Sequence, residues 1–168
     1  MILEIDDWKF DIDMTATMEY SAKEVAEHCD CAYCRNFYAA VDGVYPDLRP
    51  YLAQFGLDID APDESLPIDI ENEMWYDSVY LVCGKILAVG SSDLLCDGVQ
   101  IRPTKEHELH INSRCPEPRF FLDVGRLILP WLLDEPMEDV ISPANEPSFL
   151  KKMWDKLLKR QPKNDITS

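Results

Sequence analysis

The sequence predicts an α+β fold, with helices in the N-terminal third, a largely antiparallel sheet in the middle and second half, and an amphipathic C-terminal helix. Two observations support this prediction. Apolar residues recur with helical spacing before residue 56, whereas later segments show the short apolar runs and turn residues typical of strands. Helices and strands are therefore segregated along the chain, while a parallel sheet would need them to alternate. We expect a single acidic domain over residues 1–168.

The chain is expected to open with a strand and then a helix. Apolar and polar residues alternate over residues 8–13, which is typical of a half-buried strand. Ser21 and Glu24 then form a capping box, in which the serine hydroxyl would accept a backbone hydrogen bond while the glutamate reaches back. The first helix is therefore predicted near residues 22–28.

Two further helices are predicted before residue 56. One is expected over residues 31–42 with Asp30 as its cap, because apolar side chains recur there at i, i+3, i+4 and i+7. The other is expected over residues 46–55 and should end at Gly56, which suits the left-handed position after a helix. Residues 58–67 are acidic and rich in proline, and they are predicted to form a loop.

Most strands are predicted between residues 68 and 132. They are expected over residues 75–83, 86–89, 94–96, 99–101, 108–112, 119–124 and 127–131. Gly84-Lys85 would form one hairpin turn, and Asp97-Gly98 a second, because both residues of the latter pair tolerate positive φ. Gly125 separates two apolar runs and predicts a bulge or a bend.

The last predicted element is a basic amphipathic helix near residues 149–160. Its apolar side chains form one stripe: Phe149, Leu150, Met153, Trp154, Leu157 and Leu158. Such a stripe is too apolar to remain in water, and its lysines complement the acidic remainder of the chain. We expect residues 148–168 to dock on their own domain, or on a second copy in a dimer.

Charge is the most unusual property of the composition. The chain has 32 acidic and 16 basic residues, a formal net charge of −16, and Pro50–Gly84 contains no lysine or arginine. A field of this sign repels nucleic acid and anionic membranes and favours basic partners. The alternative is that the charge only maintains solubility. If a basic protein binds, the expected contact residues are Asp58, Asp60, Asp63 and Glu64.

The expected location is the cytoplasm. No apolar run approaches the roughly 20 residues that span a bilayer, and the first ten residues lack the basic and apolar regions of a signal peptide. The six cysteines of such a chain are better interpreted as reduced thiols or metal ligands than as a disulfide framework.

Three cysteines form the clearest candidate site. Cys29, Cys31 and Cys34 fall within six residues at the start of a predicted helix, where they could occupy three corners of a zinc tetrahedron. The fourth ligand would be His28, Cys115 or another distant group. Two alternatives to metal binding stay open. The cysteines could serve as packing residues, because Cys34 lies on the apolar stripe of its helix. They could also serve as redox-active thiols.

Other candidate sites have weaker support. His107 and His110 are three residues apart on a predicted strand, so their side chains would lie on opposite faces. The acidic run that begins at Asp58 lacks the glycine and the glutamate of a calcium loop. The sequence contains no nucleophile elbow, no phosphate-binding glycine loop and no dinucleotide fingerprint, so no catalytic residue is predicted.

One family resemblance follows from three motifs. Cys29-Asp-Cys31-Ala-Tyr-Cys34-Arg-Asn36-Phe37, Gln54-Phe-Gly-Leu-Asp58 and the segment 121–135 resemble those of a family of small uncharacterised bacterial proteins. The resemblance covers about residues 8–136. It implies a bacterial cytosolic setting and assigns no activity to any residue.

Two functions are therefore expected. The first is a non-enzymatic binding protein that presents acidic surface to a basic partner, as an inhibitor or an immunity protein would. The alternative is a small zinc-binding domain organised by Cys29–Cys34.

Overall fold

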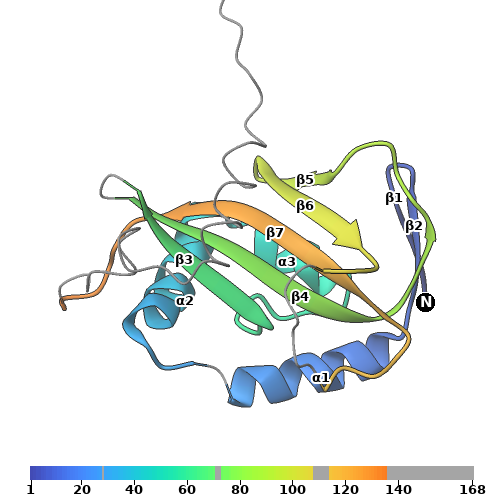
Figure 1. Ribbon diagram of the computed structural model, residues 1–168, viewed down its shortest axis with the longest axis horizontal. Coiled ribbons are helices and arrows are strands. Elements are labelled where there is room, and N and C mark those ends of the chain that lie inside the picture. Colours follow the sequence, from blue (N-terminus) through green and yellow to red (C-terminus); the bar gives the residue numbers. More distant parts are fainter. Residues whose placement is uncertain (28, 71–72, 108–113, 136–168) are drawn as a thin grey trace, which may run out of the picture. The chain divides into compact units, whose positions relative to one another are not determined.

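In a computed structural model, the described part of the chain forms a mixed fold of three helices and a seven-stranded antiparallel sheet (Figure 1). The structure describes residues 1–27, 29–70, 73–107 and 114–135, which fall within the unit Met1–Pro136. The strands are β1 (Ile2–Ile5), β2 (Trp8–Ile12), β3 (Glu64–Ile70), β4 (Glu73–Ala88), β5 (Leu94–Cys96), β6 (Val99–Thr104) and β7 (Arg119–Leu129). The helices are α1 (Met14–Ala26), α2 (Ala32–Val44) and α3 (Leu48–Ala53).

These elements confirm the α+β class and the antiparallel sheet in the part of the chain that the structure describes. Helices occupy the first third, and most strands follow residue 63. The predicted strand over residues 108–112, the predicted helix over 149–160 and the docking of residues 148–168 all lie outside the described residues.

Strand β4 organises the sheet. The strand order is β1-β2-β4-β7-β6-β5, and β3 also pairs with β4. The 16-residue β4 has β7 along one edge, while β3 pairs with its first half and β2 with its last residues on the other edge. Antiparallel contacts to three strands make β4 the centre of the sheet, and α1 packs against β4 while α2 packs against β7.

The main core contains a stack of aromatic rings. The ring of Phe10 stacks on Phe120 with centroids 5.4 Å apart and meets the edge of Phe55 at 5.3 Å. All three side chains are completely buried, and they come from β2, β7 and the segment just after α3. The buried aromatic rings therefore connect β2 and β7, which flank β4, to the segment that follows α3.

The first helix begins eight residues earlier than the capping box predicts. Asp13 is its N-cap, and a carboxylate oxygen of Asp13 accepts from the backbone N–H of Ala16 at 3.0 Å. The predicted cap Ser21 is instead buried within the helix, where its hydroxyl accepts from the backbone N–H of Asp58 at 2.9 Å. The capping-box prediction was therefore wrong, because the Ser21 hydroxyl serves a tertiary contact.

The predicted hairpin at Gly84-Lys85 is also wrong, since β4 continues through both residues. Gly84 has a φ of 154°, and a Cβ atom at this position would lie 2.3 Å from the carbonyl oxygen of Asp11. Glycine is required here because the backbone of β2, which pairs with β4 at this position, leaves no room for a Cβ atom.

Other local predictions are confirmed. Asp97 and Gly98 have φ values of 50° and 77° in the turn between β5 and β6, and Gly56 has a φ of 83° after α3. The register of β4 against β7 shifts between Tyr76 and Ser78, so the glycine-interrupted segment is a bulged strand. The predicted acidic loop ends earlier than expected, because β3 begins at Glu64.

A candidate metal centre at the start of helix α2

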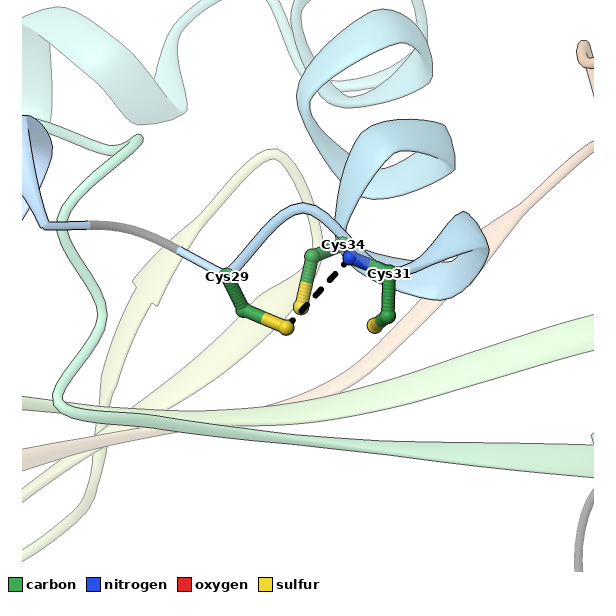
Figure 2. Close-up of side chains that lie close together, drawn as sticks. All are labelled: Cys29, Cys31 and Cys34. Atoms are coloured by element: carbon green, nitrogen blue, oxygen red, sulfur yellow. Dashed lines mark hydrogen bonds between the residues drawn. The ribbon is translucent and has the colours of Figure 1, made fainter.

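The three predicted cysteines lie together where the chain enters α2, as Figure 2 shows. Cys29 and Cys31 are exposed and Cys34 is half-buried. Their sulfur atoms all lie within 4.8 Å of one another. We refer to Cys29, Cys31 and Cys34 as the cysteine trio.

Helix geometry produces this arrangement. Cys31 is the N-cap of α2, and its backbone is extended at φ −71° and ψ 159°. The prediction of Asp30 as the cap was therefore wrong by one residue. Cys34 follows three residues after Cys31, so its side chain returns to the same side of the helix. The Cys29 sulfur accepts a hydrogen bond from the backbone N–H of Cys31 at 3.4 Å. The chain before the helix is therefore folded back against its first turn.

The first turn of α2 favours negative charge on sulfur. Burial opposes ionisation of Cys31, but hydrogen bonds from the backbone of Cys34 and Tyr33 and from the other two thiols hold the pKa of Cys31 below its ordinary value. The unpaired N–H groups of a helix N-terminus act in the same direction. Burial raises the pKa of Cys34 far above its ordinary value, and the negative charges of Cys31 and Cys29 raise it further. A cation between the sulfurs would remove that mutual repulsion.

The spacing of the sulfurs suits one ion. Four ligands at the Zn–S distance of about 2.3 Å place sulfurs roughly 3.8 Å apart in a tetrahedron. Three sulfurs within 4.8 Å of one another can reach this spacing by small side-chain rotations. In a 2Fe–2S or 4Fe–4S cluster three thiolates cannot all bind the same iron, and sulfurs on different irons stand farther apart. The trio therefore fits a mononuclear thiophilic ion better than a cluster.

Of the two predicted fourth ligands, neither joins the trio in the described residues. His28 lies outside them. Cys115 is buried beside Cys83 at a sulfur–sulfur distance of 3.3 Å and does not belong to the cluster. The described residues thus supply three thiolate ligands at this position.

The base of the trio is tied to the end of β7 by Asn36, which the sequence analysis named only as part of the cysteine motif and gave no role. The Asn36 side chain is completely buried. Its amide nitrogen donates to the Pro130 carbonyl at 3.1 Å and to the Tyr76 hydroxyl at 3.3 Å, and its oxygen accepts from the backbone N–H of Leu132 at 2.7 Å. Its only signal in the sequence is its place two residues after Cys34. Such bonds hold the first turns of α2 in one orientation.

An ion pair also links the trio to the segment after β7. Arg35 contacts the carboxylate of Asp30 at 3.6 Å and forms a short ion pair with Glu135. The Tyr33 ring lies against Trp131 with centroids 5.7 Å apart. The residues between and around the cysteines therefore contact segment 130–135, which lies about 100 residues away in the sequence.

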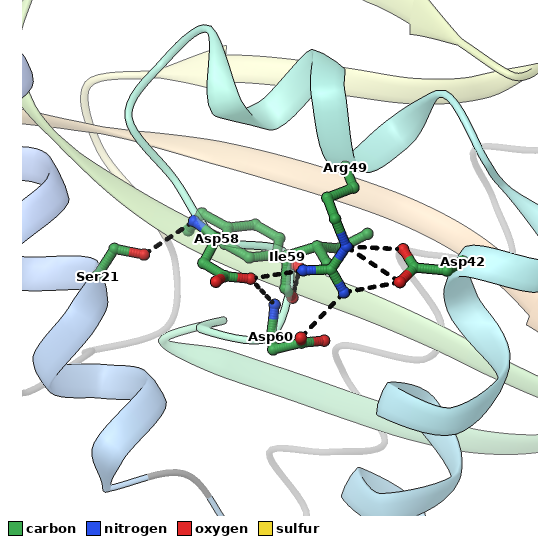
Figure 3. Close-up of polar contacts among 7 residues, drawn as sticks. Ser21, Asp42, Arg49, Asp58, Ile59 and Asp60 are labelled. Carbon is green, nitrogen blue, oxygen red and sulfur yellow. Dashed lines mark hydrogen bonds and ion pairs between the residues drawn. The ribbon is translucent and has the colours of Figure 1, made fainter.

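Two of the predicted partner-binding acids are engaged within the fold (Figure 3). Arg49 contacts Asp58 at 2.8 Å, Asp60 at 2.9 Å and Asp42 at 2.8 Å. Hydrogen bonds to Asp42 raise the pKa of the Arg49 guanidinium. Burial lowers this pKa, but the hydrogen bond and the charge of Asp60 raise it further, so the net shift is upward. Arg49, which sequence analysis did not identify, therefore organises this acidic loop.

The other two predicted acids differ from each other. Asp63 accepts a short hydrogen bond from the Tyr20 hydroxyl and a second from the backbone N–H of Leu81 at 2.8 Å. Glu64 begins β3, and partial burial raises the pKa of its carboxyl. Binding of a basic partner by these four acids stays a prediction, and the contacts of Asp58, Asp60 and Asp63 within the fold leave less of their charge available for it.

Of the two remaining candidate histidines, the structure describes one, and it does not belong to a cluster of possible metal ligands among the described residues. His107 packs against Phe121 with ring centroids 5.6 Å apart, and His110 lies outside the described residues. Over the described ranges, the cysteine trio is the group of metal-ligating side chains that the geometry brings together.

Comparison of the chain with protein-family models, curated proteins and solved structures finds no match. The family resemblance of the cysteine motif therefore remains an interpretation of its residues. Among the described residues, no helix is both long enough and apolar enough to cross a membrane.

Proposed function

We propose that this protein binds a single zinc ion through Cys29, Cys31 and Cys34. One observation carries the proposal, which is the convergence of three sulfurs to within 4.8 Å of one another. Thiolate ligands favour thiophilic ions such as zinc over magnesium or calcium, which prefer oxygen.

The position of the trio indicates what a bound ion does for the fold. Cys29 belongs to the connection between α1 and α2, Cys31 is the N-cap of α2, and Cys34 lies in the first turn of that helix. An ion shared by all three side chains fixes this connection against the helix, so the free energy of binding also stabilises the local fold. Three protein ligands leave a fourth position for water or a further side chain.

Binding must depend on pH, because thiols bind metal as thiolates. The pKa of Cys31 is lowered and that of Cys34 is raised, so Cys34 is the thiol that must lose its proton at the greater cost. Zinc affinity is therefore expected to rise with pH, and binding should release protons to the solvent.

A competition titration tests the proposal. The purified full chain, reduced and stripped of metal, is titrated with zinc in the presence of a chromophoric chelator. We expect one zinc per chain, and we expect Cys31→Ser to weaken this binding by about 100-fold or more. Cys96→Ala is the matched control, because Cys96 is buried in β5 away from the trio and its loss should leave the titration unchanged. Wild-type protein that takes up no zinc, or a Cys31→Ser variant that binds zinc as tightly as the wild type, would contradict the proposal.

A further inference from the structure

A second group of cysteines lies in a small core beneath α1. The sulfurs of Cys83 and Cys115 are 3.3 Å apart, and each residue is 3% exposed. Tyr20 and Leu81 are buried in the same cluster, and Phe121 packs against it. We refer to Cys83 and Cys115 as the cysteine pair. Its members are 32 residues apart in the sequence.

The fold holds the cysteine pair in register without a covalent bond. Cys83 pairs with Arg119 across β4 and β7. The backbone N–H of Gly84 donates to the Pro118 carbonyl at 2.7 Å, and Arg119 Nη1 donates to the Cys115 carbonyl at 2.7 Å. The segment before β7 therefore folds back and places the Cys115 sulfur over β4.

A cavity provides access to this position. It has a volume of about 580 Å³ and lies between the start of α1, β4 and the segment Pro116–Pro118. Cys83 and Gly84 form part of its wall, and so does Asp13 at the N-terminus of α1. A small solute can thus come close to Cys83, whose buried sulfur it reaches after a local opening, whereas Cys115 does not line the cavity.

We propose that Cys83 and Cys115 form an oxidation site that reacts with a small peroxide and closes to a disulfide. The Cys83 sulfur attacks one oxygen of hydrogen peroxide, the O–O bond breaks, and Cys83 becomes a sulfenic acid as one water leaves. The Cys115 sulfur then attacks the Cys83 sulfur, the S–O bond breaks, and the Cys115 proton leaves in a second water. The two thiols lose two electrons, and the peroxide gains them.

The geometry favours this order of steps. Cys83 meets the cavity, so it is the first to react. Burial raises the pKa of Cys115, and its hydrogen bond and charge interaction with Cys83 raise it further, so Cys115 keeps its proton until the sulfenic acid has formed. Bond formation at about 2.05 Å requires the sulfurs to approach by only about 1.3 Å from their separation of 3.3 Å.

Tryptic mapping of the full chain tests the proposal, because the sequence separates the relevant cysteines. Cleavage after lysine and arginine, except before proline, leaves Cys83 in peptide 36–85, Cys96 in 86–105, Cys115 in 115–119 and the cysteine trio in 24–35. The native protein is treated with a few equivalents of hydrogen peroxide, remaining thiols are alkylated, and the digest is analysed without reduction. We expect peptide 36–85 to be linked to 115–119, the link to disappear with dithiothreitol, and Cys96 to be recovered alkylated after denaturation.

The cross-link should also stabilise the fold. Closing a loop of this length raises the melting temperature by about 5–10 °C, and reduction should reverse the gain. Cys115→Ser should show no gain, and the mapping of wild-type protein stands even if that variant fails to fold. Recovery of peptides 36–85 and 115–119 as separate species after peroxide treatment of the folded protein would overturn the proposal. The same holds if the link forms only in urea, together with links to Cys96.

Discussion

The cysteine trio and the cysteine pair contain the same side chain in opposite environments. Two of the three sulfurs of the trio are exposed at the start of α2, with hydrogen-bond donors of the helix directed at them. Both members of the pair are buried among apolar side chains of β4 and the segment before β7. The first environment favours thiolates and a cation, whereas the second favours neutral thiols.

This difference shows that the surroundings of a thiol, and not the distance between sulfurs alone, determine its chemistry. The pair is closer than 3.5 Å, yet it offers two ligands in a dry cluster where a charged ion would be poorly solvated. The trio offers three ligands at the surface, where water can supply a fourth. Metal binding is therefore expected at the trio and disulfide formation at the pair.

The largest expected difference is in alkylation rate. In reduced, metal-free, folded protein, Cys31 should react with iodoacetamide about 10³-fold or more faster than Cys83 or Cys115, because the buried pair reacts only after local opening. The lowered pKa of Cys31 means that its thiolate persists as pH falls below the ordinary thiol value, so its reaction should continue to lower pH than that of Cys34. Mass spectrometry of the tryptic peptides over time measures these rates, with fragmentation of peptide 24–35 to separate Cys31 from Cys34. Equal rates for the pair and the trio would contradict the burial on which the comparison depends.

A smaller but specific effect is expected on metal affinity. Serine at any one position of the trio should weaken zinc binding by about 100-fold or more, since loss of a ligand costs at least as much as loss of a residue that orients one. Cys83→Ser and Cys115→Ser should change the affinity by less than about threefold. Chelator competition measures each constant. The comparison fails if a serine in the pair weakens zinc binding as much as a serine in the trio.

The smallest expected effect is on the stability of metal-free protein. Alanine at both Cys83 and Cys115 removes two buried side chains and should lower the free energy of unfolding by about 1–3 kcal/mol. Alanine at both Cys29 and Cys31 should change it by less than about 0.5 kcal/mol, because those side chains are exposed. Urea denaturation of the two double variants, with chelator present, provides the measurement. Equal losses would show that the trio also serves as packing.

Sequence spacing predicted the trio because its geometry is local. Three cysteines within six residues at a helix start must lie close together, whatever the rest of the fold does. The pair could not be predicted in this way. Its sulfurs meet only because residues 115–118 fold back over β4. The sequence instead indicated Cys115 as a possible fourth metal ligand of the trio.

The same distinction between local and long-range contacts explains which predictions of the fold were wrong. Ser21 has the local pattern of a helix cap, but its hydroxyl is used by the backbone of Asp58, which is 37 residues away. Gly84 resembles a turn residue, but it is required by the close approach of Asp11 from β2. The turn at Asp97-Gly98 was predicted correctly, since its two residues determine its backbone angles without help from other segments.

The coordination of the bound ion tests the central claim most directly. X-ray absorption at the zinc edge, on full-length protein loaded with one equivalent, reports the ligand atoms and their distances. We predict three sulfurs at about 2.3 Å and one nitrogen or oxygen at about 2.0–2.1 Å. The sulfur contribution should fall to two in the Cys31→Ser variant and remain at three in Cys83→Ser. A wild-type spectrum explained by nitrogen and oxygen ligands alone would contradict the assignment of a metal centre to Cys29, Cys31 and Cys34.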